Sequence, residues 1–206
     1  MSEESGSGGR KPAGAAVMQP QVTAAIRMAA FEELADVGYG KLSMEAVARR
    51  AGVSKPTLYR RWSTKQDLVI GLISEVAVDA ADSPDTGSVR GDLRAFLAQS
   101  AEVLTNPLVA RIIPDILAQA VRVPALREVL QLGIGQSRRA RVARILHRAI
   151  DRGELPESLN LELALDFIGA PLFWRVMLGG DPTGPAYLDQ LTDMLLAAFG
   201  ATETAS

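Results

Sequence analysis

The sequence lacks cysteine entirely and contains a single histidine, His147, among 206 residues. Without cysteine there can be no disulfide framework, no thiolate metal site and no cysteine nucleophile. One histidine leaves too little for a multi-histidine metal site or a histidine-based catalytic triad. The acidic residues are dispersed rather than paired, which disfavours hydrolytic chemistry. We therefore expect a protein that is not an enzyme and that holds no metal and no cofactor.

Aromatic residues are scarce as well, at 5% of the chain, although hydrophobic residues make up 48%. Most of the apolar surface must then come from alanine, leucine, valine and isoleucine, a balance that favours helices. No segment shows the alternating pattern of a strand. The length suits one or two folding units. The composition therefore predicts an all-α protein.

Long hydrophobic runs are missing. The most apolar stretch, residues 167–178, contains Pro171 and Arg175, and it falls short of the roughly 20 apolar residues that cross a bilayer. Residues 1–19 are rich in serine, glycine and alanine and lack the apolar core of a secretory signal, so we expect a disordered tail. These features predict a cytoplasmic protein with no membrane partner.

The chain as a whole carries no large charge of one sign, since 24 acidic and 22 basic residues give a net charge of −2. The distribution along the chain is uneven. Between Lys41 and Lys65 seven basic residues stand against Glu45 alone, which gives this segment a charge of +6 and leaves −8 for the remainder. A compact basic patch on an acidic protein is typical of nucleic-acid contact, because neutralising phosphates releases counterions.

Apolar residues at helical spacing predict about nine helices. The first occupies residues 22–37 and should stop at Gly38. Two short helices follow, one capped by Ser43 and one capped by Ser54 with Pro56 in its first turn. The remaining expected helices are residues 66–81, 89–104, 110–120, 124–152, 161–178 and 185–199.

Two short helices joined by a tight turn at Gly52, the second one basic, indicate a helix-turn-helix. The chain from Gln21 to about Val76 resembles the DNA-binding domain of TetR-family transcriptional regulators. Glu33 departs from the family pattern, which usually has leucine there. The motif that carries the resemblance reads Ser43-Met44-x-x-Val47-Ala48-x-x-Ala51-Gly52-Val53-Ser54-Lys55-x-Thr57-Leu58-Tyr59-x-x-Trp62-x-x-Lys65.

The resemblance implies a DNA-binding domain at 20–80, with its motif at 43–62, and a regulatory and dimerisation domain at 81–206. It also implies a repressor that binds a palindromic double-stranded DNA operator and is released by an unknown small apolar effector. A constitutive DNA binder, or a helical ligand-binding protein with a vestigial DNA-binding domain, remains an alternative. The DNA-binding residues by resemblance are Ser43, Ser54, Lys55, Pro56, Thr57, Tyr59, Arg61 and Lys65.

Each of these residues has an expected task. Residues 54–57 face base edges and the sugar-phosphate rim, Tyr59, Arg61 and Lys65 contact phosphates, and Ser43 begins a helix whose amides meet another phosphate. Arg10 and Lys11, just ahead of the first helix, are expected to reach DNA as a flexible arm.

The last two helices are more apolar than one buried face requires, which predicts a homodimer. By resemblance they pack against their symmetry mates as a four-helix bundle. The predicted interface residues are Phe167, Leu172, Val176, Leu188, Leu191, Leu195 and Phe199. The C-terminal helices are also expected to enclose the effector pocket, although each candidate could equally be plain core. The pocket candidates are Phe96, Ile113, Leu117, Leu130, Ile134, Phe173, Trp174 and Met177.

A second basic cluster comprises Arg138, Arg139, Arg141, Arg144, Arg148 and Arg152. The favoured interpretation is a solvated helix whose arginines pair with acids nearby or across a dimer. The alternative is that the cluster binds an anion.

Overall fold

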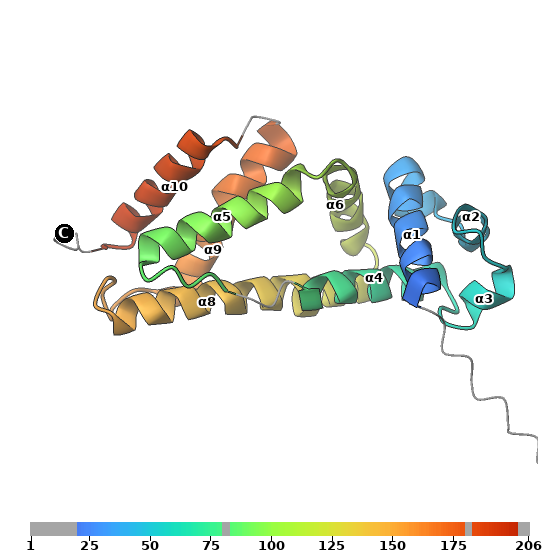
Figure 1. Ribbon diagram of the computed structural model, residues 1–206, viewed down its shortest axis with the longest axis horizontal. Coiled ribbons are helices and arrows are strands. Elements are labelled where there is room, and N and C mark those ends of the chain that lie inside the picture. Colours follow the sequence, from blue (N-terminus) through green and yellow to red (C-terminus); the bar gives the residue numbers. More distant parts are fainter. Residues whose placement is uncertain (1–19, 80–82, 180–182, 202–206) are drawn as a thin grey trace, which may run out of the picture.

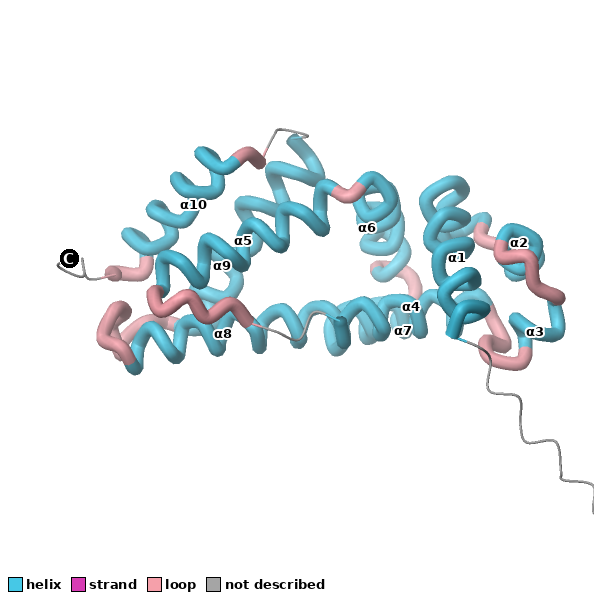
Figure 2. Tube along the Cα trace, viewed as in Figure 1, coloured by secondary structure: helices cyan, strands magenta, loops and turns pink. Residues whose placement is uncertain are grey.

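The computed structural model describes residues 20–79, 83–179 and 183–201. Within these ranges the chain is helical and forms no strand (Figures 1 and 2), which confirms the all-α prediction. None of the described helices is long and apolar enough to cross a membrane. The predicted tail at 1–19, with Arg10 and Lys11, lies outside the described residues.

The first helix, α1, spans Pro20–Lys41 and changes direction at Gly38. Gly38 has a φ of 73°, a left-handed conformation that glycine adopts without steric cost. The stop predicted there is a real break in helical geometry, and one further turn follows it. The next helices are α2 at Met44–Arg50, α3 at Lys55–Tyr59 and α4 at Lys65–Asp79.

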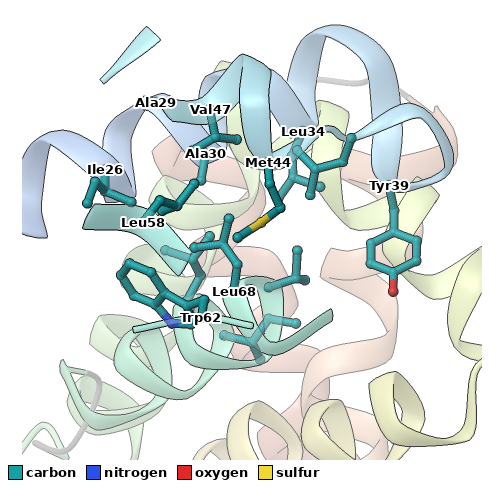
Figure 3. Close-up of a cluster of buried hydrophobic side chains, with 14 of the residues drawn as sticks. Ile26, Ala29, Ala30, Leu34, Tyr39, Met44, Val47, Leu58, Trp62 and Leu68 are labelled. Carbon is teal, nitrogen blue, oxygen red and sulfur yellow. The ribbon is translucent and has the colours of Figure 1, made fainter. Parts of the chain in front are cut away.

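A hydrophobic core joins these four helices (Figure 3). Val47 of α2, Leu58 of α3 and Leu68 of α4 are each 0% exposed, and the indole of Trp62 packs beside them. The helical pattern predicts that Leu58 and Trp62, with Val47 and Val53, hold the two short helices together. Val47, Leu58 and Trp62 are buried, and Val53 is partly buried against the same core, which confirms it. The α2–α3 unit is therefore fixed to α1 and α4.

The C-terminal part begins with α5 at Val89–Thr105 and α6 at Pro107–Ala120. Helix α6 starts three residues earlier than predicted because the Asn106 side chain accepts hydrogen bonds from the amides of Leu108 and Val109, and Pro107 fits the first helical position. The expected single helix at 124–152 is a rod of three parts. These are α7 at Pro124–Val129, the π-helical η1 at Leu130–Gly135 and α8 at Gln136–Asp151.

The chain ends with α9 at Leu161–Trp174, a π-helical turn η2 at Arg175–Gly179 and α10 at Pro185–Ala198. Helices α5, α8, α9 and α10 enclose a second hydrophobic core. The two cores lie at opposite ends of the molecule, and α4 and the α7–η1–α8 rod run lengthwise between them (Figure 1).

The first core is not confined to the predicted DNA-binding domain. It includes Ile116 and Ala120 of α6 and Leu126 of α7, all beyond the expected boundary at residue 80. Helix α6 packs against α1, and α4 packs against α7 and η1. The regulatory part therefore supplies side chains to the core that supports the helix-turn-helix.

Candidate nucleic-acid interface

Helix α2 begins at a capped end. The Ala46 amide donates to Ser43 Oγ over 3.3 Å, and Ser43 Oγ donates to Glu45 Oε2 over 3.1 Å. The first bond satisfies an amide that has no partner within the helix. The cap predicted at Ser43 is confirmed, and the start of α2 is fixed beside α3.

Helix α3 presents its first turn to solvent. Ser54, Lys55 and Pro56 are exposed and Thr57 is partly so. Ser54 occupies the N-cap position, but its hydroxyl pairs with the Thr57 hydroxyl at 2.9 Å rather than with a backbone amide. The predicted capping bond at Ser54 is therefore wrong. The two hydroxyls instead fix each other at the exposed end of the helix.

Glu45 connects α2 to α3 on the same surface. Its carboxylate lies 3.5 Å from Lys55 Nζ and accepts from the Tyr59 hydroxyl over 3.4 Å. Bonds from its own amide and from Ser43, together with the charge of Lys55, hold the pKa of Glu45 below its usual value. Glu45 therefore stays ionised and holds two predicted DNA contacts in place. Sequence reasoning counted it only as one negative charge.

The two remaining predicted phosphate contacts differ in their surroundings. Arg61 is exposed, donates to Thr23 Oγ1 over 3.0 Å and lies over the Trp62 ring. Lys65 Nζ donates to the Tyr39 and Gly40 carbonyls over 2.9 Å each and lies over the Tyr39 ring. Lys65 therefore joins α4 to the end of α1 with two of its three donors, and its predicted phosphate contact stays a prediction.

Not all of the basic segment faces outward. Arg50 forms ion pairs with Glu33 at 3.1 Å and Asp36 at 2.8 Å, both on α1. These pairs reduce the charge available on the surface. They also explain Glu33, which is 8% exposed: the departure from the family pattern is a buried carboxylate matched to Arg50.

The predicted dimer residues fall into two groups. Phe167 is 52% exposed and Val176 is partly exposed. The prediction that the other five face a partner is wrong, because they lie in the core of a single chain and are at most 7% exposed. They are Leu172, Leu188, Leu191, Leu195 and Phe199.

A different apolar face is exposed on the last helices. Leu163, Phe167, Trp174 and Leu178 are 52–66% exposed and recur at helical spacing along α9 and η2, with Ala170 between them. Met194 of α10 is 72% exposed. We name these six residues the α9 face. The apolar composition of α9 predicts more than one apolar side, but periodicity does not indicate which stripe the chain itself buries.

The predicted pocket residues are not gathered around one space. Phe96 is 1% exposed in the second core, whereas Leu130 packs against the first core. Leu117 and Ile134 are 42% and 38% exposed, and Ile113, Phe173 and Met177 are partly buried. Trp174 alone among the eight lines an open depression of about 560 Å³ between α9, η2 and α10.

Three of the six arginines in the second basic cluster, on and just after α8, are paired with acids. Arg139 pairs with Glu162 and Asp166 of α9, and Arg152 pairs with Glu154 at 2.7 Å. Arg148 lies 3.2 Å from the buried Asp92 of α5. The favoured prediction, arginines paired with nearby acids, is confirmed for these three residues.

Asp92 is the centre of the buried part of this cluster. The amide and hydroxyl of Thr86 donate to its Oδ1, and Arg148 donates to its Oδ2. Burial raises the pKa of Asp92, but these hydrogen bonds and the charge of Arg148 outweigh it and hold the pKa below its ordinary value. The side chain is therefore a paired carboxylate that fixes α5 to α8.

The capped helix α2 lies beside α3, whose first turn is exposed and polar, and both pack on a core of four helices. This arrangement defines a helix-turn-helix DNA-binding protein. Two family models match the chain. "Bacterial regulatory proteins, tetR family" covers residues 26–72, and "Tetracyclin repressor-like, C-terminal domain" covers residues 83–195. The second model spans the larger part of the chain. The chain belongs to the TetR family of transcriptional regulators.

Relatives extend over both parts of the chain. It is 30% identical to the uncharacterized HTH-type transcriptional regulator YdeS of Bacillus subtilis, covering 88% of this chain and 90% of that one. It is 32% identical to the DNA-binding transcriptional repressor TetR of Mycobacteroides abscessus, covering 84% and 91% respectively. The crystal structure of the TetR family transcription regulator SCO0332 aligns with a TM-score of 0.65 at 29% identity, covering 86% of this chain and 97% of that one.

Proposed function

We propose that this regulator is a repressor that binds a palindromic operator as a homodimer and is released by a small-molecule effector. The observation that carries the DNA-binding part is the exposed first turn of α3, where Lys55 and Thr57 stand beside Tyr59 and Arg61. Lysine can bond guanine O6 and N7, and the threonine methyl can meet a thymine methyl. Residues 54–57 read bases, and Tyr59 and Arg61 contact phosphates.

The homodimer is supported by the α9 face, an exposed apolar surface of the kind that marks protein interfaces. A symmetric pair of recognition helices can occupy successive major grooves, which are about 34 Å apart. Repression is supported by the relative named as a repressor. Because the operator is chromosomal DNA, the protein acts in the cytoplasm.

Effector control is supported by the match to the regulatory C-terminal family model and by the contact of α6 and α7 with the first core. The eight predicted pocket residues remain our candidates for the effector site. Binding of a ligand among the C-terminal helices shifts α6 and α4 and changes the separation of the two recognition helices. Such coupling is typically worth about 1–3 kcal/mol between sites.

The first experiment selects operator sequences from random DNA and then compares variants on them. K55A and T57A are expected to change the preferred sequence, whereas Y59F and R61A weaken binding to all sequences alike and flatten its salt dependence. R122A, at an exposed arginine in the turn after α6, is the control for a lost positive charge. Unchanged affinity in the K55A/Y59A double variant would contradict the proposed interface.

A second experiment separates the alternatives in cells that carry a reporter behind the selected operator. Repression lifted by small molecules supports an effector-controlled repressor. Repression that no compound lifts supports the constitutive DNA binder. Failure to select any operator supports a ligand-binding protein with a vestigial DNA-binding domain.

A further inference from the structure

One arginine of the α8 cluster differs from its neighbours. Arg138 is partly buried, and among the described residues no carboxylate forms an ion pair with it, whereas Arg139, Arg148 and Arg152 each have one. Burial and the charges of Arg141 and Arg139 all lower the pKa of Arg138. The protein therefore keeps a positive charge where it is disfavoured, since removing a charge from water without a partner is costly.

The guanidinium is held inside the regulatory part. It lies over the Phe96 ring of α5 at 5.3 Å from the ring centroid, and the Arg141 guanidinium lies at the same distance from that ring. Phe96 is 1% exposed. Arg138 therefore points toward the second core of its own chain.

On α9, Gly169 lies against the Arg138 guanidinium. A Cβ atom at Gly169 would overlap the Arg138 guanidinium, so a larger residue there would displace the end of this side chain. Glycine inside a helix is unfavourable because it loses more backbone freedom than any other residue. An unfavourable helical glycine in α9 and a cation without a carboxylate in α8 therefore lie at the same place.

We propose that Arg138, with Arg141 beside it, binds the anionic group of the effector, so that the effector is an organic acid rather than a neutral apolar molecule. The inference rests on the proposed effector-controlled function. A guanidinium matches carboxylate and phosphate groups in two-pronged geometry. The exposed Ile134, four residues before Arg138, offers apolar surface to the body of such a molecule.

The first test needs no ligand. In R138M the apolar side chain replaces the unpaired charge, so the thermal midpoint of the ligand-free protein should equal or exceed that of the wild type. R144M, at an exposed position of the same helix, is the matched control for loss of one charge. A midpoint of R138M several degrees below that of R144M would show that Arg138 stabilises the ligand-free fold, and would overturn the proposal.

The second test uses matched probes in thermal-shift titrations without DNA: octanoate and 4-butylbenzoate, the amide of each, octyl phosphate, and inorganic phosphate. The acids should raise the wild-type midpoint at concentrations at least tenfold lower than their amides, and R138M should lose this difference while R144M keeps it. Stronger shifts with octyl phosphate than with octanoate would identify a phosphate group as the preferred anion. Equal action of acids and amides, or no shift of the wild type by any probe, would overturn the proposal.

Operator binding of the wild type and R138M is measured separately by mobility shift. We expect both proteins to bind the operator and octanoate to release it only from the wild type. Loss of operator binding by the wild type itself would refute the proposed function, whatever the anion titrations show. The two failures are therefore distinguishable.

Discussion

Glu45 places a negative charge on the surface where the protein is proposed to meet DNA. It holds Lys55 and Tyr59 in the free protein and repels phosphates. In E45A the lysine is free to contact DNA, so binding to unrelated sequences should tighten by about three- to tenfold and the salt dependence should steepen by about one counterion. Titrations over a range of salt concentrations measure both quantities.

The exposed Glu157, far from the helix-turn-helix, provides the control variant E157A. Unchanged binding in E45A would show that Glu45 does not face DNA. Weaker binding confined to the selected operator would show instead that the carboxylate accepts a hydrogen bond from a base.

Asp92 should dominate the acid sensitivity of the C-terminal core. Its pKa is lowered in the folded protein, so its contribution is present above the ordinary carboxylate pKa and is lost as the pH falls through the lower, folded value. D92N leaves Arg148 without its buried partner and should reduce the free energy of unfolding at pH 7 by about 3 kcal/mol. Its stability should also fall less steeply below about pH 4.

Urea denaturation between pH 3 and pH 7 tests this prediction, with D151N, at the exposed last residue of α8, as control. If D92N and the wild type lose stability in parallel across this range, Asp92 is not the responsible group.

At the level of single residues, local partners were predictable and distant ones were not. The Ser43 cap was predicted because its bond reaches only three residues along the chain. Lys65 donates to carbonyls 25 and 26 residues earlier. A contact between residues so far apart leaves no pattern in the sequence. The same holds for Arg138, whose surroundings come from α5 and α9. Its position among six arginines gave no sign that it would lack an acid among the described residues.

Helix α6 joins the regulatory part to α1. Its Asp115 Oδ2 accepts from the Tyr39 amide over 2.6 Å, and its Arg111 lies 3.4 Å from Asp36. Both contacts hold α6 to the end of α1. In D115A the Tyr39 amide loses its partner, which should lower the free energy of unfolding by about 1–3 kcal/mol.

Hydrogen exchange of the Tyr39 amide measures the local effect, and it should accelerate strongly in D115A. The variant D115N keeps an acceptor oxygen and should retain most of the protection. Equal protection of Tyr39 in D115A and the wild type would show that the contact does not hold α6 in solution.

Element boundaries followed from capping and glycine signals, with two exceptions. The π-helical segments η1 and η2 interrupt regions that the hydrophobic pattern predicted as continuous helices, because one extra residue in a turn hardly alters a pattern of apolar positions. Likewise α10 has one apolar stripe in the core and Met194 on the opposite side. Periodicity identifies such stripes, but it cannot assign one to the core and another to a partner.

For the whole molecule, the α9 face predicts the state of assembly. The double variant F167D/W174D places two charges in the proposed interface, so light scattering at micromolar concentration should give a dimer mass for the wild type and a monomer mass for the variant. Affinity for the selected palindrome should fall by at least 100-fold, because one recognition helix then binds without the other.

L132D, at an apolar position that is 53% exposed but lies on η1, is the control and should remain dimeric. A monomeric wild type, or a dimeric F167D/W174D, would place the interface elsewhere.

The π-helical segment η1 also bears on which changes of chain length the protein can tolerate. A π turn holds one residue more than an α turn, so deletion of Gly133 would restore continuous α-helix and leave α7 and α8 facing their present cores. Deletion of Ala140 from α8 would not be compensated in this way. Every later residue of the helix would rotate by about 100°, which would turn Ile145 and Leu146 out of the core. Natural relatives that lack a residue in this rod should therefore have lost it between 130 and 135.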